Sequence, residues 1–144
     1  MIQKLTEKDL HCWAQMAADV YDSSVAEMLK EYEAGVYSNQ FQNEYMYWHN
    51  NEIAGFISLT LRYDYVNGCE TSPVGYVEGI YIKPTFRKMH IGAELIDFAK
   101  QWAKEKDATE LASDCLIDNL DSLHFHEAVG FEEKERVICF AMKI

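Results

Sequence analysis

A basic loop between a strand-like run and a helix-like run is the first part of this sequence that could do chemistry. Residues 86–95 read FRKMHIGAEL and follow YVEGIYIKP. Backbone N–H groups at a helix N-terminus, with basic side chains beside them, can hold a phosphate. His90 stands where such a loop most often has glycine. We expect His90 to keep ordinary right-handed φ and ψ, so that its N–H stays available.

Two carboxylates also stand at informative places. Glu78 lies beside Gly79, which suggests a β-bulge or a close backbone approach inside its strand, and Asp114 ends the short run TELASD. A charge at a buried strand is unusual unless it is paired or functional. Both interpretations stay open: the carboxylates bind a cationic amine, or they are salt-bridged strand ends. If they bind an amine, their charge also raises its pKa and opposes its deprotonation.

The bulk properties limit the function classes. A chain of 144 residues with 49% hydrophobic and 26% charged residues fits one domain, residues 1–144. The net charge of −11 argues against nucleic acid and membrane partners and favours cationic small molecules, although solubility alone also explains it. The sequence has neither a signal-peptide pattern nor an apolar run of bilayer length, so we expect a cytoplasmic protein. Its four cysteines lack metal-binding spacing, and we expect no metal.

Hydrophobic periodicity predicts the elements that position these residues. The expected strands are residues 2–5, a hairpin over 44–66 that turns at Asn50 and Asn51, residues 74–82, TELAS, and a final strand KERVICFAM. The expected helices follow Thr6 and Ser24 and cover 91–106 and 119–129. The order β-α-α-β-β-β-α-β-α-β describes an α/β (α+β) fold with a mixed, mostly antiparallel sheet.

This order resembles the GNAT acetyltransferase superfamily, and three local patterns carry the resemblance. VEGIYIKP resembles the bulged strand that binds pantetheine, RKMHIGA resembles the Arg-x-x-Gly-x-Gly/Ala pyrophosphate loop, and FHEAVGF resembles the segment that closes the last helix. Within the superfamily, RYDYVNGCETSPV, ELASD and GFEEKERVI are similar to the small subclass of aminoglycoside 6′-N-acetyltransferases that confer antibiotic resistance in Gram-negative bacteria.

The resemblance implies a function. It implies transfer of an acetyl group from acetyl-CoA to the 6′-amine of an aminoglycoside, by direct attack in a ternary complex, in a homodimer. Two alternatives remain open: an acetyltransferase for another small cationic amine, such as a polyamine or peptide, and a non-catalytic acyl-CoA-binding regulatory module. Carboxylates aimed at an acceptor amine argue against the module.

The resemblance also implies roles for individual residues. Asp114 or Glu78 would act as base through a water, with Asp114 preferred, and His126 would protonate the leaving thiolate where the superfamily usually has tyrosine. A packed helix histidine is the alternative for His126. The implied cofactor contacts are the backbone of Ile80, Tyr81 and Ile82, the loop residues Arg87, Lys88, Met89, His90, Ile91, Gly92 and Ala93, and the side chain of Asn119. The implied substrate contacts are Tyr21, Ser24, Tyr65, Glu78, Asp114 and Glu135.

Overall fold

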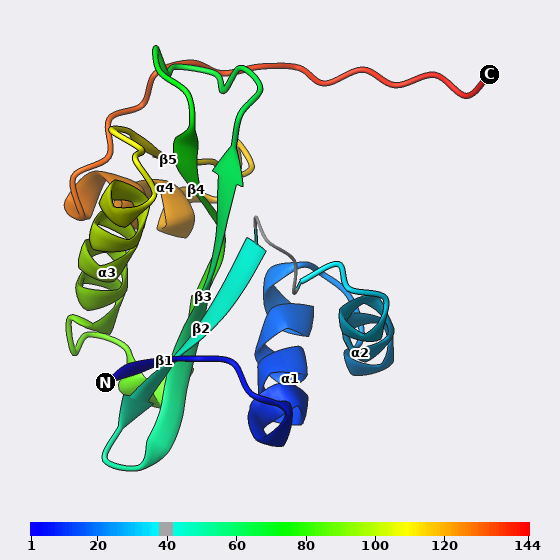
Figure 1. The fold of residues 1–144 in the computed structure, drawn as a ribbon, viewed down its shortest axis with the longest axis vertical. Coiled ribbons are helices and arrows are strands. Elements are labelled where there is room, and N and C mark those ends of the chain that lie inside the picture. The colour runs from blue at the N-terminus through cyan, green and yellow to red at the C-terminus, as the bar shows by residue number, and fades with distance from the viewer. Residues whose placement is uncertain (38–41) are drawn as a thin grey trace.

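A five-stranded sheet with helices on both faces forms the protein (Figure 1). The computed structural model describes residues 1–37 and 42–144. The strands are β1 (Ile2–Lys4), β2 (Gln42–His49), β3 (Glu52–Arg62), β4 (Val74–Ile82) and β5 (Leu111–Ser113). The helices are α1 (Leu10–Val20), α2 (Val25–Glu33), α3 (Ile91–Glu105) and α4 (Leu120–Ala128), with short 3-10 turns η1 (Glu7–Asp9) and η2 (Pro84–Phe86).

The sheet has the predicted mixed character. Its strand order is β1-β2-β3-β4-β5, with antiparallel neighbours from β1 to β4 and one parallel pair, β4 with β5. The β2–β3 hairpin turns at Asn50 and Asn51, whose φ values of 47° and 65° are both left-handed. Such turns match the right-handed twist of the flanking strands, and asparagine tolerates this conformation better than most residues. The α/β fold class predicted from the sequence is therefore confirmed.

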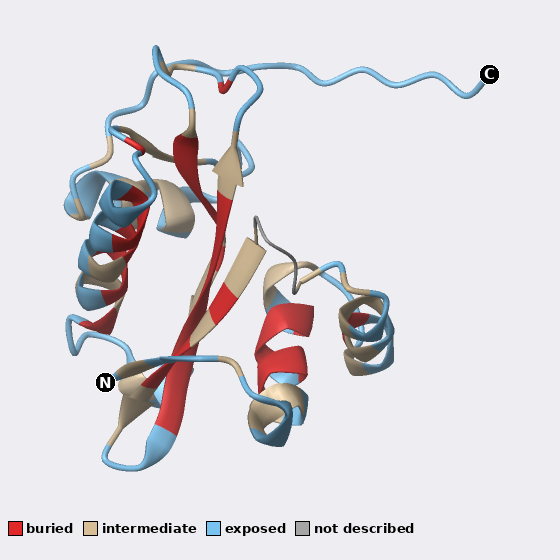
Figure 2. Ribbon diagram, viewed as in Figure 1, coloured by how far each residue is buried: buried red, intermediate tan, exposed pale blue. Residues whose placement is uncertain are grey.

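Two apolar clusters hold the helices against opposite faces of the sheet (Figures 1 and 2). Helix α1 buries Trp13 and Met16 against Met46 and Phe56 on one face. Helix α3 buries Leu95 and other apolar residues against the second face, in agreement with the hydrophobic periodicity of residues 91–106. Within the residues that the structure describes, no helix combines the length and apolar character needed to cross a bilayer.

The predicted final strand is absent from the described chain. KERVICFAM lies in an extended segment after α4 that belongs to no strand and runs away from the domain (Figure 1). Its large apolar side chains are exposed, and Phe140 is 90% exposed. A strand needs a neighbouring backbone to satisfy its N–H and C=O groups, and this segment pairs with none among residues 1–37 and 42–144. The prediction of this strand is wrong for the isolated chain.

Candidate active site

A β-bulge interrupts β4 where the sequence suggested one. Ser58 pairs with Gly79, whereas the next residue, Leu59, pairs with Val77, so Glu78 is the extra residue. A Cβ added at Gly79 would lie 2.4 Å from the Tyr21 hydroxyl. The close approach that requires glycine therefore comes from a side chain rather than from another backbone.

Beyond the bulge, β4 keeps a strand partner on one side only. β5 pairs with β4 from Gly75 to Val77 and then ends, whereas β3 continues to pair as far as Ile82. Lys83 donates its N–H to the Ala54 carbonyl of β3 at 2.8 Å. Because backbone groups alternate in direction along a strand, those of Ile80 and Ile82 point away from β3. These are two of the three residues expected to bond pantetheine.

The loop between β4 and α3 departs from our expectation for its backbone. His90, the N-cap of α3, has φ 61° and ψ 12°, and Lys88 has φ 64°, so both residues are left-handed. The prediction of right-handed geometry at His90 is wrong. The reason is that the chain turns sharply into the helix here, and histidine accepts a conformation that costs a non-glycine residue about 1–2 kcal/mol.

This geometry supports an anion site in a different way. Successive residues that alternate between left-handed and right-handed backbone turn their N–H groups into one concave nest, which binds anions. Lys88 and His90 supply the left-handed positions, and α3 begins at Ile91. The first intrahelical bond of α3 runs from the Glu94 N–H to the His90 carbonyl, which leaves the N–H groups of residues 91–93 at the open helix terminus.

Two neighbouring residues have other partners than expected. A Cβ added at Gly92 would lie 2.6 Å from the Phe125 ring of α4. The glycine therefore permits α3 and α4 to pack closely. Arg87 donates its Nε–H to the Ile82 carbonyl at 3.0 Å, and its guanidinium lies 5.8 Å from the centre of the Tyr81 ring. In this arrangement Arg87 ties the loop to the end of β4.

Glu78 is paired with a cation that the sequence reasoning missed. Arg62 binds both of its carboxylate oxygens, each at 2.8 Å, and the Thr60 hydroxyl donates to Oε1 at 2.6 Å. The guanidinium also stacks on Tyr76, 3.4 Å from the ring centre. Arg62 and Thr60 stand two residues apart on one face of β3, a spacing that could have pointed to them. The structure shows the salt bridge that one of the two interpretations of Glu78 requires, and a role of Glu78 in amine binding stays a prediction.

Asp114 lies on the same side of the site but is exposed. Burial, and next the hydrogen bond to the Asp114 carboxylate, raise the pKa of Tyr76. Tyr76 thus lies between the Asp114 carboxylate and the Arg62–Glu78 pair. The structure brings the two carboxylates predicted from the sequence into one polar cluster. In this cluster Glu78 forms an ion pair with Arg62, and Asp114 is exposed to solvent.

His126 is held at both ring nitrogens. Nδ1 lies 2.6 Å from the Ser122 carbonyl, and Nε2 lies 2.8 Å from the Ser113 hydroxyl. A carbonyl only accepts, so Nδ1 carries the proton of a neutral ring. The Ser113 hydroxyl lies between Nε2 and the Val77 carbonyl, which is 3.3 Å away, and its single proton can go to only one of them at a time. The Phe131 ring lies 5.3 Å away. This geometry favours the packed interpretation, because a thiolate could take a proton from Nε2 only after the ring had become cationic.

The remaining predicted residues fall into three groups. Tyr21 places its hydroxyl over the bulge, and Tyr65 is 77% exposed beside a pocket of about 440 Å³ lined by residues 61–65. Ser24 and Asn119 cap α2 and α4, accepting from the N–H groups of Glu27 and Ser122. Glu135 lies in the exposed segment after α4, so its prediction as a residue of the last strand is wrong.

Comparison with known proteins agrees with this geometry. The family model described as Acetyltransferase (GNAT) family matches residues 7–131. This chain belongs to the GNAT acetyltransferase family. Of the relatives, the aminoglycoside N(6′)-acetyltransferase type 1 of Acinetobacter haemolyticus is 34% identical over 99% of this chain and 98% of its own. The enzyme of the same name from Serratia marcescens is 51% identical over 61% of this chain and 60% of its own.

Solved structures of the family are similar over the whole domain. The crystal structure of the 6′-N-acetyltransferase AAC(6′)-Ig from Acinetobacter haemolyticus superposes with a TM-score of 0.94 at 33% identity, covering 100% of this chain and 99% of that one. The structure of AAC(6′)-Iy with the bisubstrate analogue CoA-S-monomethyl-acetylneamine has a TM-score of 0.90 at 30% identity, covering 100% of this chain and 98% of that one.

The described residues contain no group of three His, Cys, Asp or Glu side chains arranged for a metal.

Proposed function

We propose that this protein is an acetyl-CoA-dependent N-acetyltransferase that acetylates the 6′-amine of aminoglycosides and thereby confers resistance. The observation that carries the proposal is whole-length similarity to a structure whose ligand joins CoA to an acetylated aminoglycoside fragment. A cytoplasmic location follows from the proposal, because acetyl-CoA is used inside the cell.

The residues present fit acetyl-CoA as the co-substrate. The nest at Lys88 to His90 and the open terminus of α3 supply backbone donors for the pyrophosphate, and Lys88 adds positive charge. The unpaired edge of β4 offers the backbone of Ile80 and Ile82 to the pantetheine arm, with the Ile80 N–H polarising the thioester carbonyl. Asn119 uses its side-chain oxygen as a helix cap, so its amide NH₂ group is the part that would donate to pantetheine.

The aminoglycoside would lie across the polar cluster formed by the end of β3, the adjoining part of β4 and Asp114. Asp114 is exposed and would bind an ammonium group directly. Glu78 would bind the substrate with the part of its carboxylate that Arg62 leaves accessible. Tyr65 would stack on a sugar ring at the pocket of residues 61–65. His126 would orient Ser113 beneath the site, and a general-acid role for it requires a second ring proton.

An assay of thiol release tests the activity. Purified protein with acetyl-CoA should release CoA with tobramycin or kanamycin, and a matched aminoglycoside with hydroxyl at the 6′ position should give only background. Spermidine and a lysine peptide serve as competing acceptors. Release with those amines and not with aminoglycosides would refute the substrate and leave an acetyltransferase for another amine. Tight acetyl-CoA binding without turnover on any acceptor would refute the enzyme.

We also propose that the protein works as a homodimer. The segment after α4 exposes Ile138 at 81%, Phe140 at 90% and Met142 at 87%, which is unfavourable in water. A second copy could supply the backbone that this segment lacks. Light scattering should give twice the 16.7 kDa chain mass, and replacing Ile138 and Phe140 together with glutamate should give a monomer. A monomeric wild type would refute the dimer.

A further inference from the structure

A buried acid lies next to the active site and has no part in the roles assigned so far. Glu44, on β2, is only 2% exposed. Its Oε1 accepts a hydrogen bond from the Ser58 hydroxyl at 2.7 Å, and its Oε2 finds no partner among the residues that the structure describes. A buried carboxyl group with an unpaired oxygen destabilises the fold, so its presence points to a use.

Glu44 belongs to a row that crosses the sheet to the bulge. Glu44 pairs with Ser58 in the β2–β3 register, and Ser58 pairs with Gly79 in the β3–β4 register. Directly opposed residues of antiparallel strands point to the same face with Cβ atoms about 5 Å apart. Gly79 has no side chain, and the Tyr21 hydroxyl occupies that space. The row therefore consists of the Glu44 carboxyl group, the Ser58 hydroxyl and the Tyr21 hydroxyl. The Tyr21 hydroxyl lies at the bulge formed by Glu78.

The hydroxyl of Ser58 connects the two ends of this row. It donates to Glu44 and accepts from the Gln42 amide at 3.3 Å, which leaves one lone pair for a second donor. The Tyr21 hydroxyl is buried, and the described part of the chain offers it no hydrogen bond of good geometry. Burial, and next the Glu44 charge, raise the pKa of Tyr21, and the neighbouring Ser58 hydroxyl lowers it.

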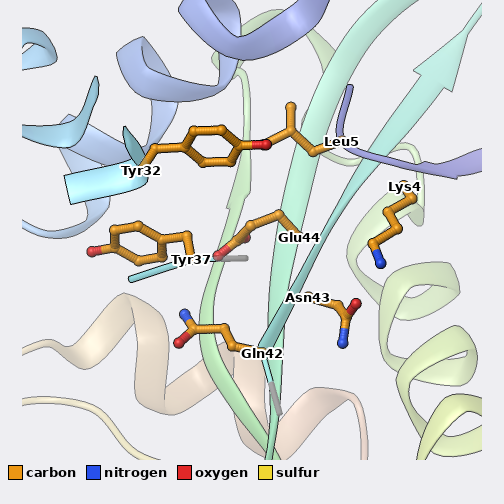
Figure 3. A pocket seen from close by; sticks show the side chains of 7 residues that line it. All are labelled: Lys4, Leu5, Tyr32, Tyr37, Gln42, Asn43 and Glu44. Atoms are coloured by element: carbon orange, nitrogen blue, oxygen red, sulfur yellow. The ribbon is translucent and has the colours of Figure 1, made fainter. Parts of the chain in front are cut away.

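The surroundings of Glu44 leave its side chain almost wholly buried. Trp13 of α1 and Tyr37 face it from the helix side, and Figure 3 shows its carboxyl group directed toward Tyr37. It borders a cavity of about 160 Å³, lined by Lys4, Leu5, Tyr32, Tyr37, Gln42, Asn43 and Glu44. Burial raises the pKa of Glu44 to about 8, the Ser58 hydrogen bond and the nearby polar groups of Trp13 and Gln42 lower it, and the Glu78 charge raises it.

We propose that Glu44 is the final acceptor of the proton that leaves the substrate amine, reached through the hydroxyls of Tyr21 and Ser58. The proposal rests on the proposed acetyltransferase function and adds the identity of its base. Tyr21 lies at the bulge end of the row, where its enclosed hydroxyl must be uncovered before it meets the amine, and Glu44 and Ser58 act through it. It replaces the expectation that Asp114 or Glu78 removes the proton.

The transfer balances in three linked steps. The amine N–H bond breaks and its proton goes to the Tyr21 oxygen, the Tyr21 proton goes to the Ser58 oxygen, and the Ser58 proton goes to Glu44. Both hydroxyls end with one proton each, Glu44 becomes neutral, and the amine gains the lone pair that attacks the thioester. The existing direction of the Ser58–Glu44 bond is the one that this transfer needs.

The other carboxylates are less suited to the task. The Arg62 guanidinium and the Thr60 hydroxyl already bind the oxygens of Glu78, so an incoming amine would compete with these donors. Asp114 is exposed, so water solvates its charge. Asp114 and Glu78 are better placed to hold an ammonium group than to remove its proton.

The test combines kcat, KM and pH on purified variants. Glu44→Gln and Ser58→Ala should each lower kcat about 100-fold with unchanged KM for acetyl-CoA and for the amine, since general-base catalysis is commonly worth 10² to 10⁴. Wild-type kcat should reach a plateau above about pH 8, whereas Glu44→Gln should keep rising with pH because hydroxide replaces the base. Ser58→Thr keeps the hydroxyl and should retain most of kcat.

Glu52→Gln, which changes an exposed acid at the start of β3, is the matched control and should behave as wild type. Circular dichroism and acetyl-CoA affinity identify any variant that fails to fold. If one fails, Tyr21→Phe interrupts the same proton path by removing its first hydroxyl and should lower kcat in the same way. Wild-type kcat and pH profile in Glu44→Gln would overturn the proposal. If the wild type acetylates only polyamines or peptides, the same comparison is run on that acceptor, and absence of all turnover would refute both proposals.

Discussion

Replacing Glu44 with glutamine should remove a specific pH dependence of folding. Burial raises the pKa of this carboxyl group from 4.5 to about 8. The folded protein therefore keeps this proton across a pH range in which the unfolded chain has lost it. Because the folded state binds more protons there, the free energy of unfolding falls as pH rises from about 4.5 to 8, and it is flat above that range.

The size of the effect follows from the width of that range. Each pH unit costs about 1.4 kcal/mol, so the full contribution of Glu44 is at most about 5 kcal/mol. Urea unfolding at pH 5.5, 7 and 8.5 measures it, with Glu52→Gln as control. Wild type and control should lose stability over this interval, and Glu44→Gln should lose about 3 kcal/mol less. Equal losses in all three proteins would show that Glu44 is ionised in the fold and would refute the reasoning.

Three further substitutions test the geometry of the site. Gly79→Ala should displace the Tyr21 hydroxyl, destabilise the fold by about 1–3 kcal/mol in urea and lower kcat, whereas an unchanged melting curve and kcat would contradict the contact. His90→Gly should relieve the left-handed backbone, raise stability by about 1 kcal/mol and preserve the acetyl-CoA affinity measured by calorimetry; a loss of affinity would mean that the imidazole itself binds the cofactor. Arg62→Leu should free Glu78 and tighten amine binding in a KM measurement, and a raised KM would show that the paired geometry is what the substrate needs.

The fold was predictable because its local signals agree with one another. Runs of apolar residues mark β3 and β4, the Asn50–Asn51 pair marks the hairpin, and apolar residues at helical spacing mark α3. The final strand was not predictable, because its sequence has strand character while strand formation depends on a partner backbone that the described part of the chain does not provide.

Within the site, side-chain identity was predictable and side-chain pairing was not. The sequence places Glu78 at a bulge and Asp114 at a strand end, but only the register of β3 against β4 brings Arg62 to Glu78. The backbone of His90 was mispredicted, because the type of a residue does not determine φ where tertiary contacts fix a turn. A signal for Glu44 was present: in NEYMYWH it falls two residues before the buried Met46, on the apolar face of the strand.

The position of Glu44 resolves a conflict between binding an amine and deprotonating it. A carboxylate close enough to hold an ammonium group also raises its pKa, so a site built only from Asp114 and Glu78 would bind substrate in its unreactive form. Pairing Glu78 with Arg62 reduces that effect at the bulge. Removing the proton to Glu44, which is buried two hydroxyls away, puts the base where its charge contributes little to binding and where burial gives it a pKa of about 8. Asp114 and Glu78 would then bind the amine as an ammonium ion, and the buried Glu44 would accept its proton before the neutral amine attacks the thioester.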